Sequence, residues 1–385
     1  MKSNSNQCTV CHLISGDLWA GAEVMAFHLL KSLAHSDSVT VSAIVFNNGR
    51  LSEELKNAGI DVIVLEESKY SFPVLVFKVY QTLRTKRIDI LHSHRQKENL
   101  LAFFVAILLR GVKLISTLHG MPETINNQRN LNAIITKVNF ILLQYIFNRT
   151  VVVSNEIRNV LVFSKGFSSQ KTIAIHNGIP LPSSGNIPKR YVTQSFTIGS
   201  AGRLVRVKDF GLLIDVANLL RNHGNIQFLL AGDGPLKSEL QSKVLDLGLN
   251  NFTFIGHLDS MSSFYTQIDL FMNTSIHEGI PMTILEAMSM GIPVVAPHVG
   301  GIPEIINDCV EGFLIKGRAP QHYAEKCKIL FMSQSNYLEM AKAAQSKIKN
   351  EFSVSKMSQK YINTYLEMFN FNLYQQEKAC AEFVE

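Results

Sequence analysis

Short β-branched and apolar runs alternate along this chain with longer stretches of helical periodicity. In the first half the runs that predict strands are residues 8–14, 39–46, 61–65, 88–92, 113–118, 150–153 and 172–176. In the second half they are residues 196–200, 227–231, 252–255, 270–273, 293–296 and 312–315. Such alternation is typical of parallel sheets whose strands are joined by crossover helices. A stretch containing Pro, Gly and Ser at 180–188 interrupts the pattern, and we interpret it as a linker.

The chain has 385 residues, which is enough for two domains that each bury a core. We predict an α/β protein with two doubly wound, Rossmann-like domains, at residues 1–182 and 183–365, facing each other across a cleft. The tail from Ser353 onward is helical and mixed in character. A final helix at about 366–385 would therefore be able to pack back on the first domain.

Composition fits a folded protein without a membrane span, because 46% of the residues are hydrophobic and 18% are charged. The longest apolar runs are too short or too often interrupted by polar residues to cross a bilayer. Residues 1–7 are polar and lead straight into a predicted strand, so no secretory signal is predicted and the cytoplasm is the expected compartment. The 5 cysteines are then expected as reduced thiols.

The formal net charge of +6 favours anionic partners, such as a nucleoside diphosphate or an anionic membrane surface. Much of the basic character of the first half is interleaved with apolar helical stretches. This pattern is compatible with a protein that rests on the inner face of a membrane, and equally with a solvated basic face. Nucleic acid is not expected, because the chain has neither basic–aromatic interleaving nor a known binding module. The basic residues concerned are Lys78, Arg84, Lys86, Arg87, Arg95, Lys97, Arg110 and Lys113.

Two carboxylates, Glu278 and Glu286, stand at the ends of one segment with seven residues between them. Pro281 is suited to a first helical turn, so a helix is predicted to start there. Its first amides, those of Met282, Thr283 and Ile284, would then be free to bind a phosphate. Glu286 could accept hydrogen bonds from vicinal hydroxyls, and Glu278 would stay in the preceding loop. The alternative interpretation is a solvated helix face with a capping acid.

Further candidates follow strand ends in the second half. Arg203 and Lys208 come after the strand at 196–200, at the sheet edge where open α/β folds bind ligands. Two cations there could neutralise a diphosphate and stabilise it as a leaving group. The backbone near Ile255, at the end of the strand at 252–255, could contact a base. The alternative for Arg203 and Lys208 is a pair of surface cations. The alternative for the backbone near Ile255 is a simple turn.

Two candidates lie in the first half. Gly21 belongs to a glycine-containing loop, residues 16–23, in which backbone amides could approach a phosphate or an acceptor closely. His119 closes the strand at 113–118 and could hydrogen-bond a sugar, although a strand-end histidine is as often structural.

The run Cys8-Thr9-Val10-Cys11-His12 matches the attachment pattern of haem c. However, it lies within the opening predicted strand, where its side chains would alternate between the two faces of a buried sheet. We therefore predict no haem. We also predict no metal, because one pair of cysteines is too few for a zinc site and no D-x-D element follows a strand among these motifs.

Taken together, these motifs resemble the retaining GT-B glycosyltransferases of family 4, over nearly the whole chain and in the order found in that family. The matching segments are 21–23, 92–94, 117–120, 177–179, 202–203 with Lys208, 232–235, the Glu278/Glu286 pair and 300–304. One departure is Ile280-Pro281, where the family pattern often has Phe-Gly.

The resemblance implies a role for each matched residue. Arg203 and Lys208 would hold the donor diphosphate, Glu286 the ribose, and Glu278 the transferred sugar. His119 would contact a sugar hydroxyl near the reacting centre.

The expected reaction is metal-independent transfer, with retention, from a nucleoside-diphosphate sugar to a surface glycan or lipid-linked acceptor, with no cofactor besides that substrate. Front-face attack and a covalent intermediate on Glu278 remain open as mechanisms. A nucleotide-sugar epimerase of the same fold and a non-catalytic sugar-nucleotide-binding protein remain as alternative functions.

Overall fold

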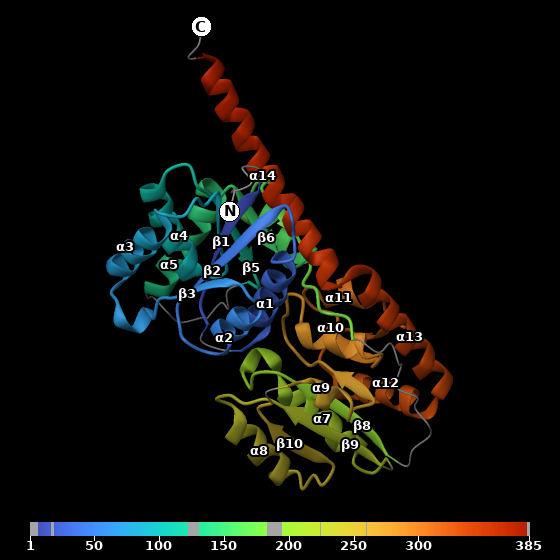
Figure 1. Cartoon of the computed structure of the whole chain (residues 1–385). Helices are drawn as coiled ribbons and strands as arrows, with labels where there is room; N and C mark the ends of the chain where they lie inside the picture. The colour runs from blue at the N-terminus through green and yellow to red at the C-terminus, as the bar shows by residue number, and fades with distance from the viewer. Residues whose placement is uncertain are drawn as a thin grey trace. The chain divides into compact units, whose positions relative to one another are not determined.

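The structure is a computed structural model, and it describes residues 7–16, 19–121, 131–182, 195–223, 225–258 and 260–382. The chain divides into two compact units (Figure 1). Unit 1 contains Met1–Gly178 and Val354–Glu385, and unit 2 contains Ile179–Ser353. The divisions thus fall at Gly178 and Ser353, whereas the ranges proposed from sequence end at 182 and 365.

Unit 1 is built on a parallel sheet with strand order β3-β2-β1-β4-β5-β6-β7 among the described residues. The order reverses beside β1, which pairs with both β2 and β4, as in a doubly wound fold. The strands are β1 (Cys8–Ile14), β2 (Val39–Val45), β3 (Asp61–Val64), β4 (Ile90–Ser93), β5 (Lys113–Leu118), β6 (Arg149–Val152) and β7 (Thr172–Ala174). The helices are α1 (Gly21–Leu33), α2 (Arg50–Asn57), α3 (Phe72–Leu83), α4 (Gln96–Leu109), α5 (Leu131–Ile141), α6 (Asn155–Asn159) and α14 (Val354–Glu382), with the short 3₁₀ helix η1 (Glu67–Lys69) and the short π-helices η2 (Leu142–Ile146) and η3 (Val160–Ser164).

Unit 2 repeats this plan with strand order β10-β9-β8-β11-β12-β13, again parallel and reversing beside the first strand, β8. The strands are β8 (Phe196–Ala201), β9 (Ile226–Ala231), β10 (Phe252–Gly256), β11 (Leu270–Met272), β12 (Val294–Pro297) and β13 (Gly312–Ile315). The helices are η4 (Arg206–Lys208), α7 (Phe210–Leu220), α8 (Lys237–Asp246), α9 (Ser262–Tyr265), α10 (Met282–Ser289), α11 (Ile302–Ile305), α12 (Pro320–Met332) and α13 (Gln334–Glu351).

Every strand predicted from sequence overlaps an observed one, and the predicted α/β, doubly wound fold class is confirmed. The reason is that parallel strands covered by helices on both faces are nearly continuous apolar runs. In β1 almost every side chain is buried, including the two thiols of Cys8 and Cys11. Burial raises the pKa of both thiols to about 12.

The last helix, α14, is part of unit 1, where it packs against α1 and β1 (Figure 1). The Ser32 hydroxyl donates to the Ser358 hydroxyl at 2.9 Å, and Tyr361 and Tyr365 are both 0% exposed. These two tyrosines are four residues apart, so they lie on the same face of the helix and enter the core of unit 1 together. Residues from Val354 onward therefore belong to the first unit.

Candidate active site

The centre of the candidate site in unit 2 is an ion pair between Lys208 and Glu278. The Lys208 ammonium contacts Oε1 of Glu278, and the side chains are 24% and 11% exposed. The Ser275 hydroxyl donates to the same carboxylate oxygen at 2.6 Å. Because the pair is largely shielded from water, its attraction is stronger than that of a surface pair.

Gly300 allows the loop that carries Glu278 to keep its position. Its φ is +55°, and a Cβ atom there would lie 1.9 Å from the carbonyl oxygen of Glu278. The next amide, Gly301 N–H, donates to that carbonyl at 3.2 Å. Only a residue without a side chain permits this approach. The double glycine, noticed in the sequence only as part of a family motif, is thus a support for Glu278.

Arg318 links the loops on either side of the ion pair. Its guanidinium donates to the carbonyl oxygen of Ser275 at 2.9 Å and also contacts the carbonyl oxygen of Thr274 and the carboxylate of Asp209. Asp209 directly follows Lys208 and has φ 43°. Sequence reasoning missed Arg318, because a single arginine far along the chain gives no local signal.

Arg203 lies in the loop after β8, and its side chain is exposed. This loop packs closely against the turn after β9, where Leu204 N–H donates to the carbonyl of Asp233 at 2.9 Å. A Cβ atom on Gly232 would lie 1.9 Å from the carbonyl oxygen of Gly202, and one on Gly234 would lie 2.6 Å from that of Leu204. The glycine turn after β9 therefore supports the loop of Arg203.

The helix predicted at Pro281 is α10, with Pro281 as its N-cap and Met282 as its first residue. The N–H groups of Met282 and Thr283 are at the start of the helix, where no carbonyl of a preceding helical turn is present to accept their hydrogen bonds. The amide of Ile284 does not share this property, because it donates to the carbonyl of Pro281 at 3.2 Å. The prediction that Ile284 offers a free amide is therefore wrong. The Met282 and Ile284 side chains are buried.

Glu286 lies inside α10 and is half-buried. The hydroxyl of Tyr265, another residue that sequence reasoning missed, donates to Oε2 of Glu286 at 2.7 Å. Burial raises the pKa of Glu286 to about 6, although the bond from Tyr265 opposes this shift. Ile255 is at the carboxyl end of β10, where the register with β9 shifts between Phe254 and Gly256.

Unit 1 contains a separate cavity of about 360 Å³ at the carboxyl ends of β4 and β5. Its lining includes Ala22, Arg95, Asn99 and His119. Gly21, the first residue of α1, directly precedes Ala22. Two residues of the predicted glycine loop, Asp17 and Leu18, lie outside the described residues.

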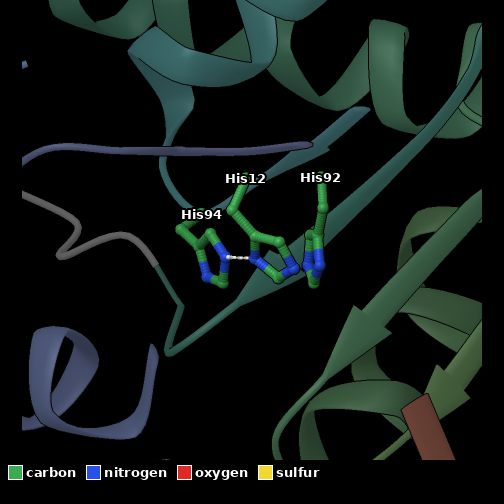
Figure 2. A group of neighbouring side chains, drawn as sticks. All are labelled: His12, His92 and His94. Carbon is green, nitrogen blue, oxygen red and sulfur yellow. Dashed lines mark hydrogen bonds between the residues drawn. The ribbon is translucent and has the colours of Figure 1, made fainter. Parts of the chain in front are cut away.

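His119 is the outermost of four neighbouring histidines, the others being His12, His92 and His94. Its Nε2 lies 3.2 Å from Nδ1 of His94, whose Nε2 lies 3.0 Å from Nδ1 of His12 (Figure 2). Burial lowers the pKa of His12 and of His119 to about 3, and that of His92 and His94 well below the usual value. All four rings are therefore neutral near pH 7.

Three of these rings could in principle be metal ligands, since nitrogens of His12, His92 and His94 lie within 4.8 Å of one another. However, both nitrogens of each of these three rings already lie within hydrogen-bond distance of a neighbouring side chain. Hydrogen bonding thus accounts for the cluster without a metal.

The predicted residues therefore fall into two sets. Unit 2 contains the residues predicted to bind the donor, and it brings Lys208 and Glu278 into direct contact. Unit 1 holds Gly21 and His119 around its own cavity.

Two family models match this chain. Residues 19–182 match "Glycosyltransferase Family 4", and residues 195–333 match "Glycosyl transferases group 1". The chain belongs to glycosyltransferase family 4. It is thus an enzyme of the glycosyltransferase class, and the resemblance stated from its motifs is confirmed.

Relatives of this glycosyltransferase include a named galactosyltransferase and a named enzyme of O-antigen biosynthesis. It is 21% identical over 387 residues to the UDP-Gal:alpha-D-GlcNAc-diphosphoundecaprenol alpha-1,3-galactosyltransferase of Escherichia coli, with 96% of this chain and 99% of that protein covered. It is 27% identical over 295 residues to the O-antigen biosynthesis glycosyltransferase WclY of Escherichia coli, with 74% and 80% covered.

Among solved structures, Anabaena HepE in complex with UDP and glucose resembles this glycosyltransferase with a TM-score of 0.81 and 23% identity. The likeness covers 94% of this chain and 100% of that one. A likeness at this identity shows the fold, which is GT-B, as predicted.

The contact between Gly300 and Glu278 leads to a prediction about stability. Gly300→Ala should lower the free energy of unfolding of unit 2 by at least about 2 kcal/mol, because the new Cβ would overlap the Glu278 carbonyl. The matched control is Gly317→Ala, which also has a positive φ, +85°, but has nothing within 4 Å. It should cost only about 1 kcal/mol of backbone strain. Urea unfolding compares the two variants, and equal costs would contradict the proposed contact.

The raised pKa of Glu286 predicts a pH effect. Because the folded carboxyl holds its proton up to about pH 6, the free energy of unfolding should fall as the pH rises from 4.5 to about 6. Glu286→Gln should remove this fall. As the pH rises from 4.5 to 7, the free energy of unfolding of this variant should therefore increase by about 1–2 kcal/mol relative to that of the wild type. The exposed Glu325→Gln is the control. Urea titrations of the wild type and both variants at pH 4.5 and at pH 7 test this prediction. An identical pH dependence in all three proteins would refute it.

Proposed function

We propose that this glycosyltransferase moves a sugar from a nucleoside-diphosphate donor to a glycan or lipid-linked acceptor, with retention at the anomeric carbon and without a metal ion. The observation that carries the proposal is the partly buried Lys208–Glu278 pair, which stands beside Ser275 in unit 2 and follows the exposed Arg203 in the chain. This arrangement supplies positive charge and a carboxylate in one unit of a fold whose solved neighbour holds UDP and glucose.

The donor diphosphate is bound, in this proposal, by Arg203 and Lys208 with the first amides of α10, those of Met282 and Thr283. Positive charge aimed at the diphosphate stabilises its departure, because negative charge grows on the leaving group in the transition state. Glu286 accepts hydrogen bonds from the ribose. Ile255 contributes backbone groups beside the base.

Front-face attack is the mechanism that we propose, with a phosphate oxygen of the leaving group accepting the proton of the acceptor hydroxyl. The Glu278 carboxylate is already engaged by Lys208 and by the Ser275 hydroxyl. A carboxylate held in this way is a weak nucleophile, since its charge is stabilised in the ground state. We therefore assign two roles to Glu278: it binds the transferred sugar, and it positions the Lys208 ammonium.

The donor arrangement predicts the effect of removing the two cations. Arg203→Ala and Lys208→Ala should each lower kcat/KM for donor turnover by at least about tenfold, because each removes charge from the leaving group. Arg221→Ala, which removes an exposed arginine after α7, is the matched control and should keep full activity. Release of nucleoside diphosphate measures turnover, and unfolding transitions confirm that the variants fold. Wild-type rates in both variants would remove the two residues from the site.

We also propose that the enzyme works at the inner, cytoplasmic face of a membrane, bound there by unit 1. Among the described residues, no helix has the length and apolar character needed to cross a bilayer. A relative acts on a diphosphoundecaprenol-linked sugar, a class of acceptor that is anchored in lipid.

The polarity of α5 supports this proposal. Ile134 is 62% exposed and Ile141 is 46% exposed, so apolar side chains face outward. In contrast, Asn139 is buried and accepts a hydrogen bond from Asn99 at 2.7 Å. An amphipathic helix normally buries its apolar side, and large exposed apolar surfaces usually mark a contact with a partner or a membrane. Other exposed apolar side chains belong to the adjoining helices: Val74, Phe77, Phe104, Ile107, Leu108, Tyr145 and Ile146.

The charge of the same part of the chain favours an anionic lipid surface over other occupants. Between residues 71 and 113 the acidic residues are Asp89 and Glu98, and Glu98 is buried against Ser15. The basic residues there are Lys78, Arg84, Lys86, Arg87, Arg95, Lys97, Arg110 and Lys113, of which Lys86, Arg95 and Lys97 are paired with Asp61, Glu23 and Glu67. Basic side chains beside an apolar face are attracted to acidic headgroups while the apolar residues enter the interface.

Vesicle binding tests the surface. Wild-type protein should sediment with phosphatidylcholine vesicles containing phosphatidylglycerol, and less with higher salt because the headgroup charge is screened. The double variant Ile134→Glu/Ile141→Glu should lose at least about tenfold in binding. Leu245→Glu, at a position 78% exposed in unit 2, should bind like the wild type. Wild-type protein that ignores these vesicles, or that forms a dimer through this face instead, would refute the proposal.

A further inference from the structure

Seven side chains of unit 1 form one continuous line of hydrogen bonds that runs from the cavity to the last helix. We call this line the relay. It begins at His119 and passes through His94 and His12, at 3.2 and 3.0 Å, to the Tyr365 hydroxyl, which lies 3.4 Å from Nε2 of His12. From Tyr365 it continues to Nδ1 of His92 at 2.7 Å, from Nε2 of His92 to the Thr117 hydroxyl at 2.9 Å, and from there to the Tyr361 hydroxyl at 2.9 Å.

The geometry of the rings is regular. The His92 and His94 rings stack at 4.4 Å between centroids with 21° between planes, and those of His94 and His119 stack at 5.5 Å with 19°. Figure 2 shows the bond between His12 and His94 and labels His92 beside them; the centroid of the His12 ring lies 4.5 Å from that of His92 and 5.3 Å from that of His94. The rings of this stack are thus fixed by their packing as well as by hydrogen bonds.

Each member of the relay has one proton to donate. Burial keeps the pKa values of all four histidines low, so the rings are neutral, with one N–H and one bare nitrogen each. Hydroxyl groups likewise carry one proton. If the group at one end of such a line must donate, its neighbour must accept and can only donate its own proton to the next group. The donor and acceptor of every following bond are then determined.

The end at Tyr361 has such a direction. Tyr361 is 0% exposed, and among the described side chains its hydroxyl has Thr117 as its hydrogen-bond partner. A buried O–H that donates to nothing is costly, so the Tyr361 hydroxyl donates to Thr117. Thr117 then donates to Nε2 of His92, whose Nδ1–H donates to Tyr365.

The second half of the relay follows in the same way. Tyr365 donates to Nε2 of His12, and the Nδ1–H of His12 donates to His94. The Nδ1–H of His94 donates to Nε2 of His119, which leaves the proton of His119 on Nδ1. That Nδ1 atom is buried and has no hydrogen-bond partner among the described residues, and His119 lines the cavity.

We propose that the relay fixes the tautomer of His119, so that this residue offers an Nδ1–H donor to an oxygen of the sugar bound in the cavity. His119 would then hold a hydroxyl by donating to it and would not act as a base at that atom. The other six members are positioning residues, of which Tyr361 sets the direction. This inference rests on the proposed function only for the identity of the ligand, since the tautomer is a property of the free protein.

Nuclear magnetic resonance of the free protein tests the tautomer. Long-range ¹H–¹⁵N spectra of histidine-labelled protein distinguish Nδ1–H from Nε2–H rings, with assignment through single His→Gln variants. We expect His12, His92, His94 and His119 all in the Nδ1–H form near pH 7. An Nε2–H form of His119 would overturn the proposal. Because no donor or acceptor is present, this result does not depend on whether the enzyme transfers a sugar.

A pair of matched variants tests the direction. Tyr361→Phe should convert His119 to a mixture of the two tautomers and lower kcat/KM by about three- to tenfold, because part of the population then presents a bare nitrogen. Tyr323→Phe removes the hydroxyl of an equally buried tyrosine in unit 2, and it should change neither. An unchanged His119 spectrum in Tyr361→Phe would refute the role of Tyr361. Should that variant not fold, Tyr365→Phe interrupts the relay at its centre and is expected to give the same mixture.

Discussion

The common direction of the strands is the constraint on which the candidate residues of each unit depend. In each sheet all strands are parallel, so their carboxyl ends meet at one edge, and the residues that follow them are brought together without being neighbours in sequence. In unit 2 this edge gathers the loops of Arg203, Lys208 and Glu278. In unit 1 it gathers His94 and His119 around a cavity. The change of strand order beside β1 and β8 marks the same position in both units.

Unit 2 holds its polar groups through close backbone contacts together with side-chain hydrogen bonds. Gly232 and Gly300 each allow one loop to approach the backbone of another more closely than any side chain would permit. Arg318 then joins the loops of Asp209 and Ser275. The charges of Lys208 and Glu278 are therefore placed before any ligand arrives, which is the condition for electrostatic stabilisation of a transition state.

The sequence predicted those parts of the fold and site that leave a local pattern. Strands were predictable because buried parallel strands are apolar throughout. The positions of Glu278, Lys208 and His119 beside strand ends or helix starts follow from the same pattern, and their roles stay predictions. Ile284 was misjudged, since its amide is used within the first turn of α10, a detail of backbone geometry that composition does not encode. Tyr265, Arg318, Tyr361 and Tyr365 were missed because each acts through a partner that is distant in the chain, and none of the four carries a signal of its own in the sequence.

The return of α14 to unit 1 has a consequence for how the protein matures. Unit 2 is contained in one uninterrupted stretch, Ile179–Ser353, whereas unit 1 is built from two stretches, Met1–Gly178 and Val354–Glu385. During synthesis the middle of the polypeptide can fold as soon as it leaves the ribosome, while the first sheet must wait for Tyr361 and Tyr365 to close its core. A polypeptide that stopped before Val354 would therefore contain a complete second unit and an unfinished first one.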